Sequence, residues 1–99
     1  MAIRSKKSTG NVFRDMGFEP AEAEHLRVRS LLMIELEQLI AKNDWTQAVA
    51  ARVFGVSQPR VSDLVRGKID KFSVDMLIEM LGRAGVDVTF SVKRRRKVA

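Results

Sequence analysis

The sequence of 99 residues contains no cysteine and only one histidine, His25. Without cysteine the fold has neither disulfide bonds nor thiolate ligands for zinc, and the chain is compatible with a reducing cytoplasm. A single histidine without a second ligand beside it does not predict a metal site. No apolar run approaches the roughly 20 residues of a membrane span, and the N-terminus lacks the apolar stretch of a signal peptide. These absences predict a cytoplasmic protein that holds no metal and does not enter a membrane.

The sequence also lacks the arrangements that catalysis requires. No nucleophile lies beside a base, and no glycine-rich phosphate loop follows a predicted strand. The carboxylates of Glu22 and Glu24 are two residues apart, as are those of Glu35 and Glu37, so each pair diverges on a helix. We therefore expect no enzymatic activity, no catalytic residue, no cofactor and no small-molecule ligand.

The net charge of +6 is distributed unevenly along the chain. Eight of the 18 basic residues lie in residues 1–7 and 93–97, which leaves 10 basic against 12 acidic residues in between. Residues 42–71 nevertheless carry six basic and three acidic side chains, and a local positive charge of this kind is typical of nucleic-acid binding. The first third is acidic, which suits a surface that faces either away from phosphate or toward a basic protein partner. Its acidic residues are Asp15, Glu19, Glu22, Glu24, Glu35 and Glu37.

Residues 46–66 carry the most specific pattern in the sequence. Ala50, Ala51 and Phe54 share one face of a predicted helix, and the small Ala51 lets a second helix cross closely. Gly55 can adopt the left-handed conformation that ends a helix, and Ser57 can cap the next one. The apolar stripe of that second helix is Val61, Leu64 and Val65. Two short helices joined in this way are typical of a helix-turn-helix, which predicts double-stranded operator DNA as the ligand.

The second of these helices is the predicted reading helix. Its outward residues, the candidates for base contacts, are Gln58, Arg60, Ser62 and Asp63. In the major groove the amide of Gln58 is suited to adenine and the guanidinium of Arg60 to guanine. Phosphate contacts are expected from Gln47, Ser57, Arg66 and Lys68. The alternative is that these are solvated side chains of a helix that binds protein, and Ser57 is needed as a cap in either case.

Three further helices are predicted around this motif. Val12, Phe13 and Met16 share one face of a short turn that Gly17 can end, with Phe18 as an additional anchor. A long helix is expected from Pro20 to about residue 42, and another from Ser73 to near residue 85. The next helix after residue 42 has two candidate caps, Asp44 and Thr46. Residues 1–10 are polar and basic, and we expect them to form a disordered arm ahead of a helical domain over residues 11–85.

Residues 86–92 alternate apolar and polar side chains, which is typical of a half-buried strand. The inward residues would be Val86, Val88, Phe90 and Val92. No other segment reads as a partner, and a lone strand leaves its main-chain groups unpaired. The pattern therefore predicts a homodimer in which the same strand of two subunits pairs across a twofold axis. The basic tail that follows, residues 93–99, either contacts phosphate, serves as a localisation signal or is a solvated tail.

In these residues the chain resembles the Xre-type, lambda-repressor-like DNA-binding domains, and within them the HigA-like antitoxins. The resemblance covers about residues 12–92 and rests mainly on residues 46–67, with 15–18, Phe72 and Ser73 in similar order. It implies an all-α, five-helix fold with a C-terminal strand that pairs across a homodimer. It also implies repression of the chain's own promoter and neutralisation of a RelE-like toxin. The candidate toxin-binding residues are Val12, Phe13, Met16 and Phe18, and a stand-alone repressor without a toxin is the alternative.

Overall fold

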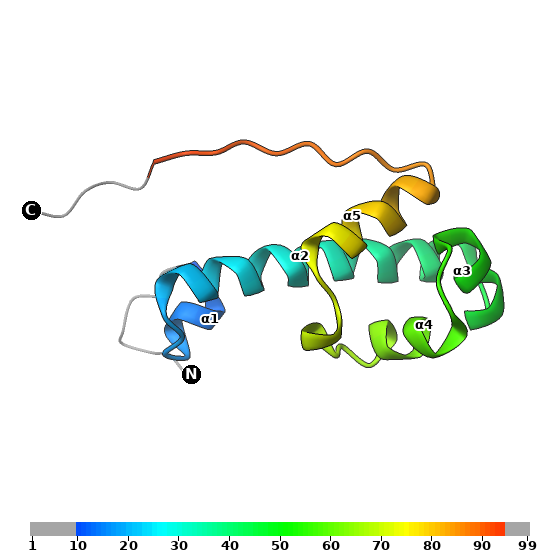
Figure 1. Cartoon of the computed structure of the whole chain (residues 1–99), viewed down its shortest axis with the longest axis horizontal. Helices are drawn as coiled ribbons and strands as arrows, with labels where there is room; N and C mark the ends of the chain where they lie inside the picture. Colours follow the sequence, from blue (N-terminus) through cyan, green and yellow to red (C-terminus); the bar gives the residue numbers. More distant parts are fainter. Residues whose placement is uncertain (1–9, 95–99) are drawn as a thin grey trace, which may run out of the picture.

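The computed structural model describes residues 10–94, and within them it is entirely helical (Figure 1). Five α-helices and one 3-10 helix follow one another: α1 Val12–Asp15, α2 Pro20–Asn43, α3 Gln47–Phe54, α4 Gln58–Val65, η1 Ile69–Lys71 and α5 Val74–Arg83. The five predicted helices are therefore confirmed. The predicted disorder of residues 1–9 and most of the basic tail, residues 95–99, lie outside the described residues. No helix in the described part is long and apolar enough to cross a membrane.

The 24-residue helix α2 is the axis of the molecule. The side chain of Glu19 caps its first turn by accepting from the Glu22 main-chain N–H, and Pro20 occupies a position where no helical hydrogen bond is lost. At the other end Asp44 adopts a left-handed conformation with φ of 55°, and α2 stops. Thr46 is then the N-cap of α3, because its Oγ1 accepts the N–H of Val49 at 3.1 Å. The structure thus assigns Asp44 to the end of α2 and the cap to Thr46.

The core lies between the C-terminal half of α2 and the helices α3, α4 and α5, which gather around it (Figure 1). Ala50 and Ala51 are buried between α3 and its neighbours, as the helix crossing requires. Trp45 packs edge-on against Phe54, with ring centroids 5.9 Å apart. Other side chains that are almost completely buried in the core are Leu36, Val61, Leu64, Phe72, Leu77, Met80 and Leu81. This packing fixes the relative positions of α3 and α4.

The short helix α1 packs on the opposite end of α2, away from this core (Figure 1). Asn11 caps α1 by accepting from the main-chain N–H groups of Phe13 and Arg14 at 3.0 and 3.3 Å. The predicted turn at Val12–Met16 is therefore present, with Asn11 as a cap that the sequence interpretation did not assign.

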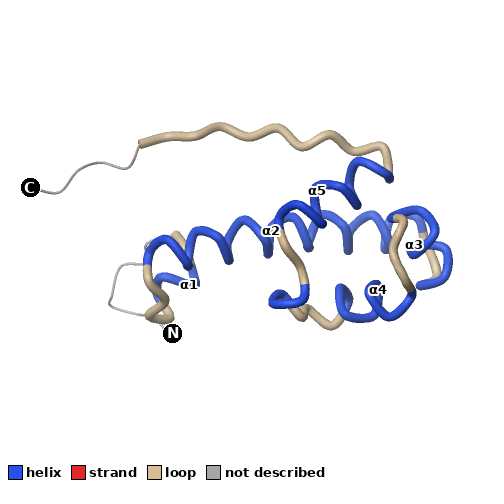
Figure 2. Tube along the Cα trace, viewed as in Figure 1, coloured by secondary structure: helices blue, strands red, loops and turns tan. Residues whose placement is uncertain are grey.

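The predicted strand over residues 86–92 is absent from the described part of the chain, where these residues form an extended arm without strand pairing (Figure 2). Val86 and Val88 are half-buried against the core, whereas Phe90 and Val92 are 80% and 87% exposed. The strand prediction is wrong for the single chain because strand hydrogen bonds require a second strand, and the described residues offer none. Leu81 accepts the Val86 N–H at 2.9 Å, which fixes only the base of the arm.

Candidate nucleic-acid interface

The helices α3 and α4 form the predicted helix-turn-helix. Gly55 ends α3 in a left-handed conformation with φ of 71°, and the Ser57 hydroxyl caps α4 by accepting the Arg60 N–H at 3.2 Å. The turn between α3 and α4 lies close to a side chain of α5. A Cβ atom at Gly55 would lie 2.7 Å from Cδ of the exposed Arg83 side chain, which would have to move, but it is the backbone conformation that favours glycine here.

Helix α4 presents one apolar and one polar face. Val61 and Leu64 are buried. By helical periodicity the face opposite them is centred between Pro59, Ser62, Asp63 and Arg66, with Gln58 and Arg60 at its two edges. Gln58 is exposed, and Ser62 and Asp63 are half-buried. Three of the four predicted base-reading residues therefore lie on or beside one solvent-accessible face.

Arg60 lies differently from the prediction. Its Nη1 donates a hydrogen bond of 3.0 Å to the main-chain carbonyl oxygen of Lys71, and its Cζ lies 5.6 Å from the ring centroid of Phe72. This distance is within the range of a cation–π contact. The guanidinium is therefore folded onto the protein's own backbone instead of extending outward from α4. Sequence reasoning could not see this contact because it depends on the path of the chain after the helix.

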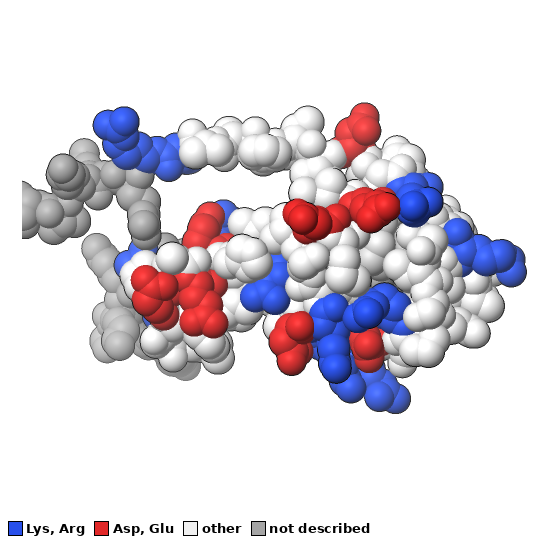
Figure 3. Space-filling model, viewed as in Figure 1, with Lys and Arg blue, Asp and Glu red and all other residues white. Residues whose placement is uncertain are grey.

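The turn after α4 brings further cations beside the reading helix. Gly67, with φ of 72°, follows the helix, and its N–H donates to the Leu64 carbonyl, while the Lys68 N–H donates to the Asp63 carbonyl, both at 3.0 Å. These two bonds form a Schellman motif that satisfies the last carbonyls of α4. Arg66, Lys68 and Lys71 are exposed there, and Figure 3 shows Lys and Arg side chains gathered over α4 and η1. Lys71 contributes to the positive charge of residues 42–71, but it is not among the phosphate contacts predicted from the sequence.

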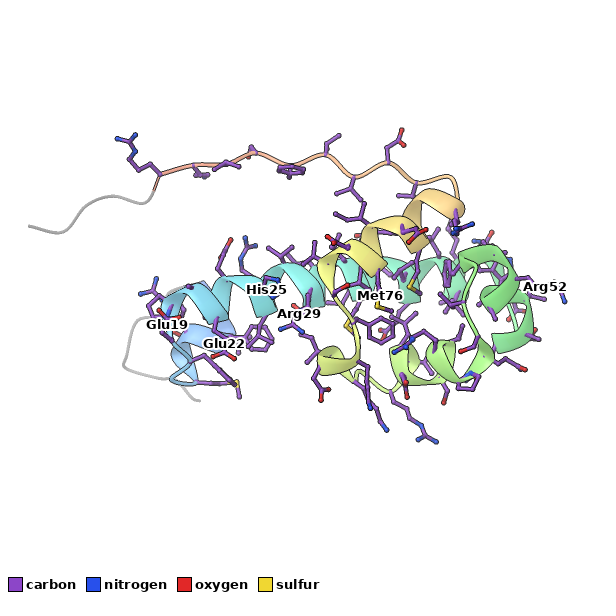
Figure 4. All side chains as sticks on the ribbon, viewed as in Figure 1. Glu19, Glu22, His25, Arg29, Arg52 and Met76 are labelled. Carbon is purple, nitrogen blue, oxygen red and sulfur yellow. The ribbon has the colours of Figure 1, made fainter. Side chains whose placement is uncertain are left out.

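The remaining phosphate candidates lie at the beginnings of the two helices. Gln47 is the first residue of α3 and is exposed, and Ser57 precedes α4. Main-chain N–H groups of a first helical turn attract phosphate, so both positions suit contacts that orient the protein on DNA. Arg52, also on α3, points away from the domain at its far end (Figure 4).

A second surface lies at the other end of α2. Val12 and Met16 are 61% and 67% exposed, and Phe18 is exposed beside the half-buried Phe13, whose ring it meets edge-on at 6.2 Å. All four predicted toxin-binding residues are therefore close together in this apolar cluster. Figure 3 shows acidic side chains at this end of the molecule, and Glu19 and Glu22 are labelled there in Figure 4. The molecule thus has a basic face and an acidic, apolar end that are separated along α2.

The two-helix unit, its glycine turn and its basic face define the class as a helix-turn-helix protein. The chain belongs to the helix-turn-helix domain family, whose model matches residues 12–93. A solved structure described as an XRE family transcriptional regulator is 31% identical, with a TM-score of 0.70 over 79% of this chain and 91% of that chain. The predicted Xre-type assignment is therefore confirmed. No curated relative matches the sequence.

Proposed function

We propose that the chain is a sequence-specific regulator of transcription that binds double-stranded operator DNA. The observation that carries the proposal is the solvent face of α4 next to the exposed cations Arg66, Lys68 and Lys71. A helix of this kind enters the major groove, while flanking cations contact the phosphates. The similarity to a regulator of the Xre family supports the same function.

The residues of α4 divide into base and phosphate contacts. The Gln58 amide matches the paired donor and acceptor of adenine, and the Asp63 carboxylate accepts from the amino group of cytosine. Ser62 lies between them on the same face and can contact either base. Each good base contact discriminates by about 1–3 kcal/mol. Arg66 and Lys68 contact phosphate, so each contributes about 0.9 to the slope of log affinity against log salt.

The regulator acts as a homodimer in our proposal. Phe90 and Val92 expose large apolar surface on an arm whose main-chain groups have no strand partner within the described residues. Pairing of this arm with the same arm of a second copy would bury the apolar side chains and give the main-chain groups hydrogen-bond partners. Two reading helices related by a twofold axis require a near-palindromic operator with half-sites about 34 Å apart.

The DNA proposal is tested by a gel shift on the DNA upstream of the chain's own gene at two salt concentrations, with an unrelated duplex for comparison. Gln58→Ala is expected to weaken operator binding about tenfold and to leave binding of the unrelated duplex unchanged. Arg66→Ala is expected to weaken both and to reduce the salt slope by about one. Arg14→Ala on α1 removes another exposed cation, at the other end of α2, and serves as the matched control. The proposal is contradicted if no shift is seen at both salt concentrations.

The apolar end of α2 supports a second function in the same protein, that of an antitoxin. Exposed Val12, Met16 and Phe18 amid acidic side chains suit a basic protein partner. The resemblance to HigA-like antitoxins makes that partner a RelE-like toxin encoded beside this gene. Because this surface is remote from α4, toxin and DNA can be bound together. A stand-alone repressor remains the alternative function, in which this surface has no toxin to bind.

Co-expression with the neighbouring gene product and size-exclusion chromatography test the antitoxin function. The double variant Val12→Ser, Met16→Ser is expected to weaken co-elution without changing the DNA shift. Ile34→Ser, which alters an exposed apolar residue of α2 outside the cluster, is the control. If the wild-type chain binds DNA but forms no complex with the neighbour, the stand-alone repressor is correct.

A further inference from the structure

Two arginine side chains from different helices converge on one short turn. Arg29 of α2 donates from Nη1 to the main-chain carbonyl oxygens of Ile69 and Phe72, at 3.1 and 3.2 Å. Arg60 of α4 donates from Nη1 to the carbonyl oxygen of Lys71 at 3.0 Å. Arg29 is labelled in Figure 4, where it points from α2 toward η1. Three carbonyls within four residues are thus held by two guanidinium groups.

Both arginines are half-buried in this arrangement, which costs a charged group part of its contact with water. The Nε of Arg29 is buried and has no hydrogen-bond partner, which is an unfavourable state for a charged group. The guanidinium of Arg60 lies over the ring of Phe72, which is almost completely buried and anchors the end of the turn in the core. Neither arginine forms an ion pair within the described residues. The two side chains therefore act on the backbone of the turn.

The guanidinium contacts add to a turn that is otherwise held by the packing of Ile69 and Phe72 and by main-chain hydrogen bonds. Helix η1 has three residues, and 3-10 hydrogen bonds of this kind are individually poor. Lys68 precedes η1 and Lys71 ends it, so the conformation of η1 sets the direction of both ammonium groups. Both lysines are exposed, and neither is paired with a carboxylate in the described part of the chain. A turn fixed before binding lowers the entropy cost of placing them against phosphates.

We propose that Arg29 and Arg60 are positioning residues that hold η1 so that Lys68 and Lys71 contact DNA phosphates, and that Arg60 does not read bases. The inference rests on the proposed function in DNA binding. It assigns to Arg60 a role opposite to the one predicted from the sequence: it contributes to affinity for any duplex, and the sequence preference comes from Gln58, Ser62 and Asp63.

The test compares wild type with Arg60→Ala by fluorescence anisotropy on the operator and on an unrelated duplex, over a series of salt concentrations. We expect Arg60→Ala to weaken both complexes by a similar factor, about five- to tenfold, and to make the salt slope shallower by about one. Arg52→Ala, which removes an exposed cation of α3 that points away, is the matched control and should leave both affinities within twofold. A loss confined to the operator overturns the proposal, because it is the behaviour of a base-reading residue.

A double-mutant cycle with Lys71→Ala provides a readout that a general loss of stability would not change. If Arg60 acts through the lysines, Lys71→Ala should cost less in the Arg60→Ala background than in wild type, whereas independent contacts give additive losses. Arg60→Gln keeps a donor for the Lys71 carbonyl and replaces Arg60→Ala in the cycle if the alanine variant does not fold. Additive losses in this cycle overturn the proposal.

Amide hydrogen exchange separates this proposal from the proposed function. The N–H groups of Lys71 and Phe72 donate within the turn, to Lys68 and Ile69, and should exchange faster in Arg60→Ala and in Arg29→Lys. The amide of Leu36 in α2 should be unchanged. If wild type binds no DNA, the DNA function fails and exchange alone decides whether the arginines fix the turn. Unchanged exchange at Lys71 and Phe72 overturns the proposal that Arg29 and Arg60 hold η1, whatever the DNA result.

Discussion

The side-chain amide of Asn11 donates a hydrogen bond of 3.3 Å to the main-chain carbonyl oxygen of Ala23, and so joins α1 to α2. Asn11 is only 7% exposed, although no residue of α1 itself is buried. The same side chain caps α1. One residue therefore fixes both the conformation and the position of the helix that carries the proposed partner-binding surface.

Asn11→Ala is accordingly expected to loosen α1 while leaving the core intact. Loss of an N-cap typically costs about 1 kcal/mol, which corresponds to about a fivefold increase in opening of α1. Trypsin cleavage after Arg14 should therefore accelerate about fivefold, and the melting temperature of the core should change little. Asn43→Ala is the control, since Asn43 is exposed and bonds only to the Leu39 carbonyl within α2. Equal cleavage rates for the two variants would contradict the assigned role of Asn11.

The parts of the fold that depend on local chemistry were predictable from the sequence. Ser57 and Ser73 are the caps of α4 and α5, and Gly55 ends α3, because capping hydroxyls and left-handed glycines act within a few residues. The candidate surface on α4 follows from the same periodicity. Local sequence patterns therefore predicted the helices and their boundaries to within about two residues. The same patterns indicated most of the proposed reading face.

The contacts that the sequence could not indicate are those between residues distant along the chain. Arg60 and Lys71 are eleven residues apart, and Arg29 meets Phe72 from another helix, so no spacing rule could indicate either contact. The arm over residues 86–92 shows a strand pattern, yet forming a strand requires a partner that one chain does not supply. The alternation of apolar and polar side chains thus indicated which of them favour burial. It did not indicate which surface would cover them.

Gly55→Ala is expected to destabilise the fold through the helix-turn-helix. Alanine would be strained at φ of 71°, and the exposed Arg83 side chain would have to move away from its Cβ, so we expect a loss of about 1–2 kcal/mol by chemical denaturation. Gly82→Ala is the matched control, because Gly82 lies inside α5 with open space around it. There alanine is expected to stabilise the protein by about 0.5–1 kcal/mol. Changes of the same sign in both variants would refute this interpretation.

Glu37 of α2 provides a prediction about pH. Its partial burial disfavours the charged form and raises the pKa of the carboxyl. Between the ordinary glutamate pKa and this raised pKa, the folded chain holds a proton that the unfolded chain has lost. The free energy of unfolding contributed by Glu37 therefore falls as pH rises through that window, and the penalty is constant above it.

Glu37→Gln removes this penalty, so the variant should be more stable than wild type at pH 7 by a margin within about 0.5 kcal/mol. Its advantage should disappear as pH falls below the ordinary pKa of glutamate. Thermal unfolding between pH 3 and pH 8 measures both effects. Glu35→Gln removes an exposed carboxylate two residues away and is the matched control. Identical curves for the two variants would be the contrary result.

The exposed end of the arm provides the test of the proposed homodimer. If arms of two copies pair, Phe90 becomes buried in each subunit, and burying such a side chain contributes about 1.5–3 kcal/mol. Phe90→Ser should then raise the dimer dissociation constant at least tenfold by analytical ultracentrifugation, since about 1.4 kcal/mol is already a factor of ten. Thr89→Ser changes the neighbouring residue, whose side chain lies on the opposite side of an extended chain, and should leave the constant unchanged.

Operator affinity should fall in Phe90→Ser and affinity for an isolated half-site should not, because the substitution leaves α4 untouched. A wild-type chain that is monomeric at every concentration, or a dimer insensitive to Phe90, would exclude this arm as the interface.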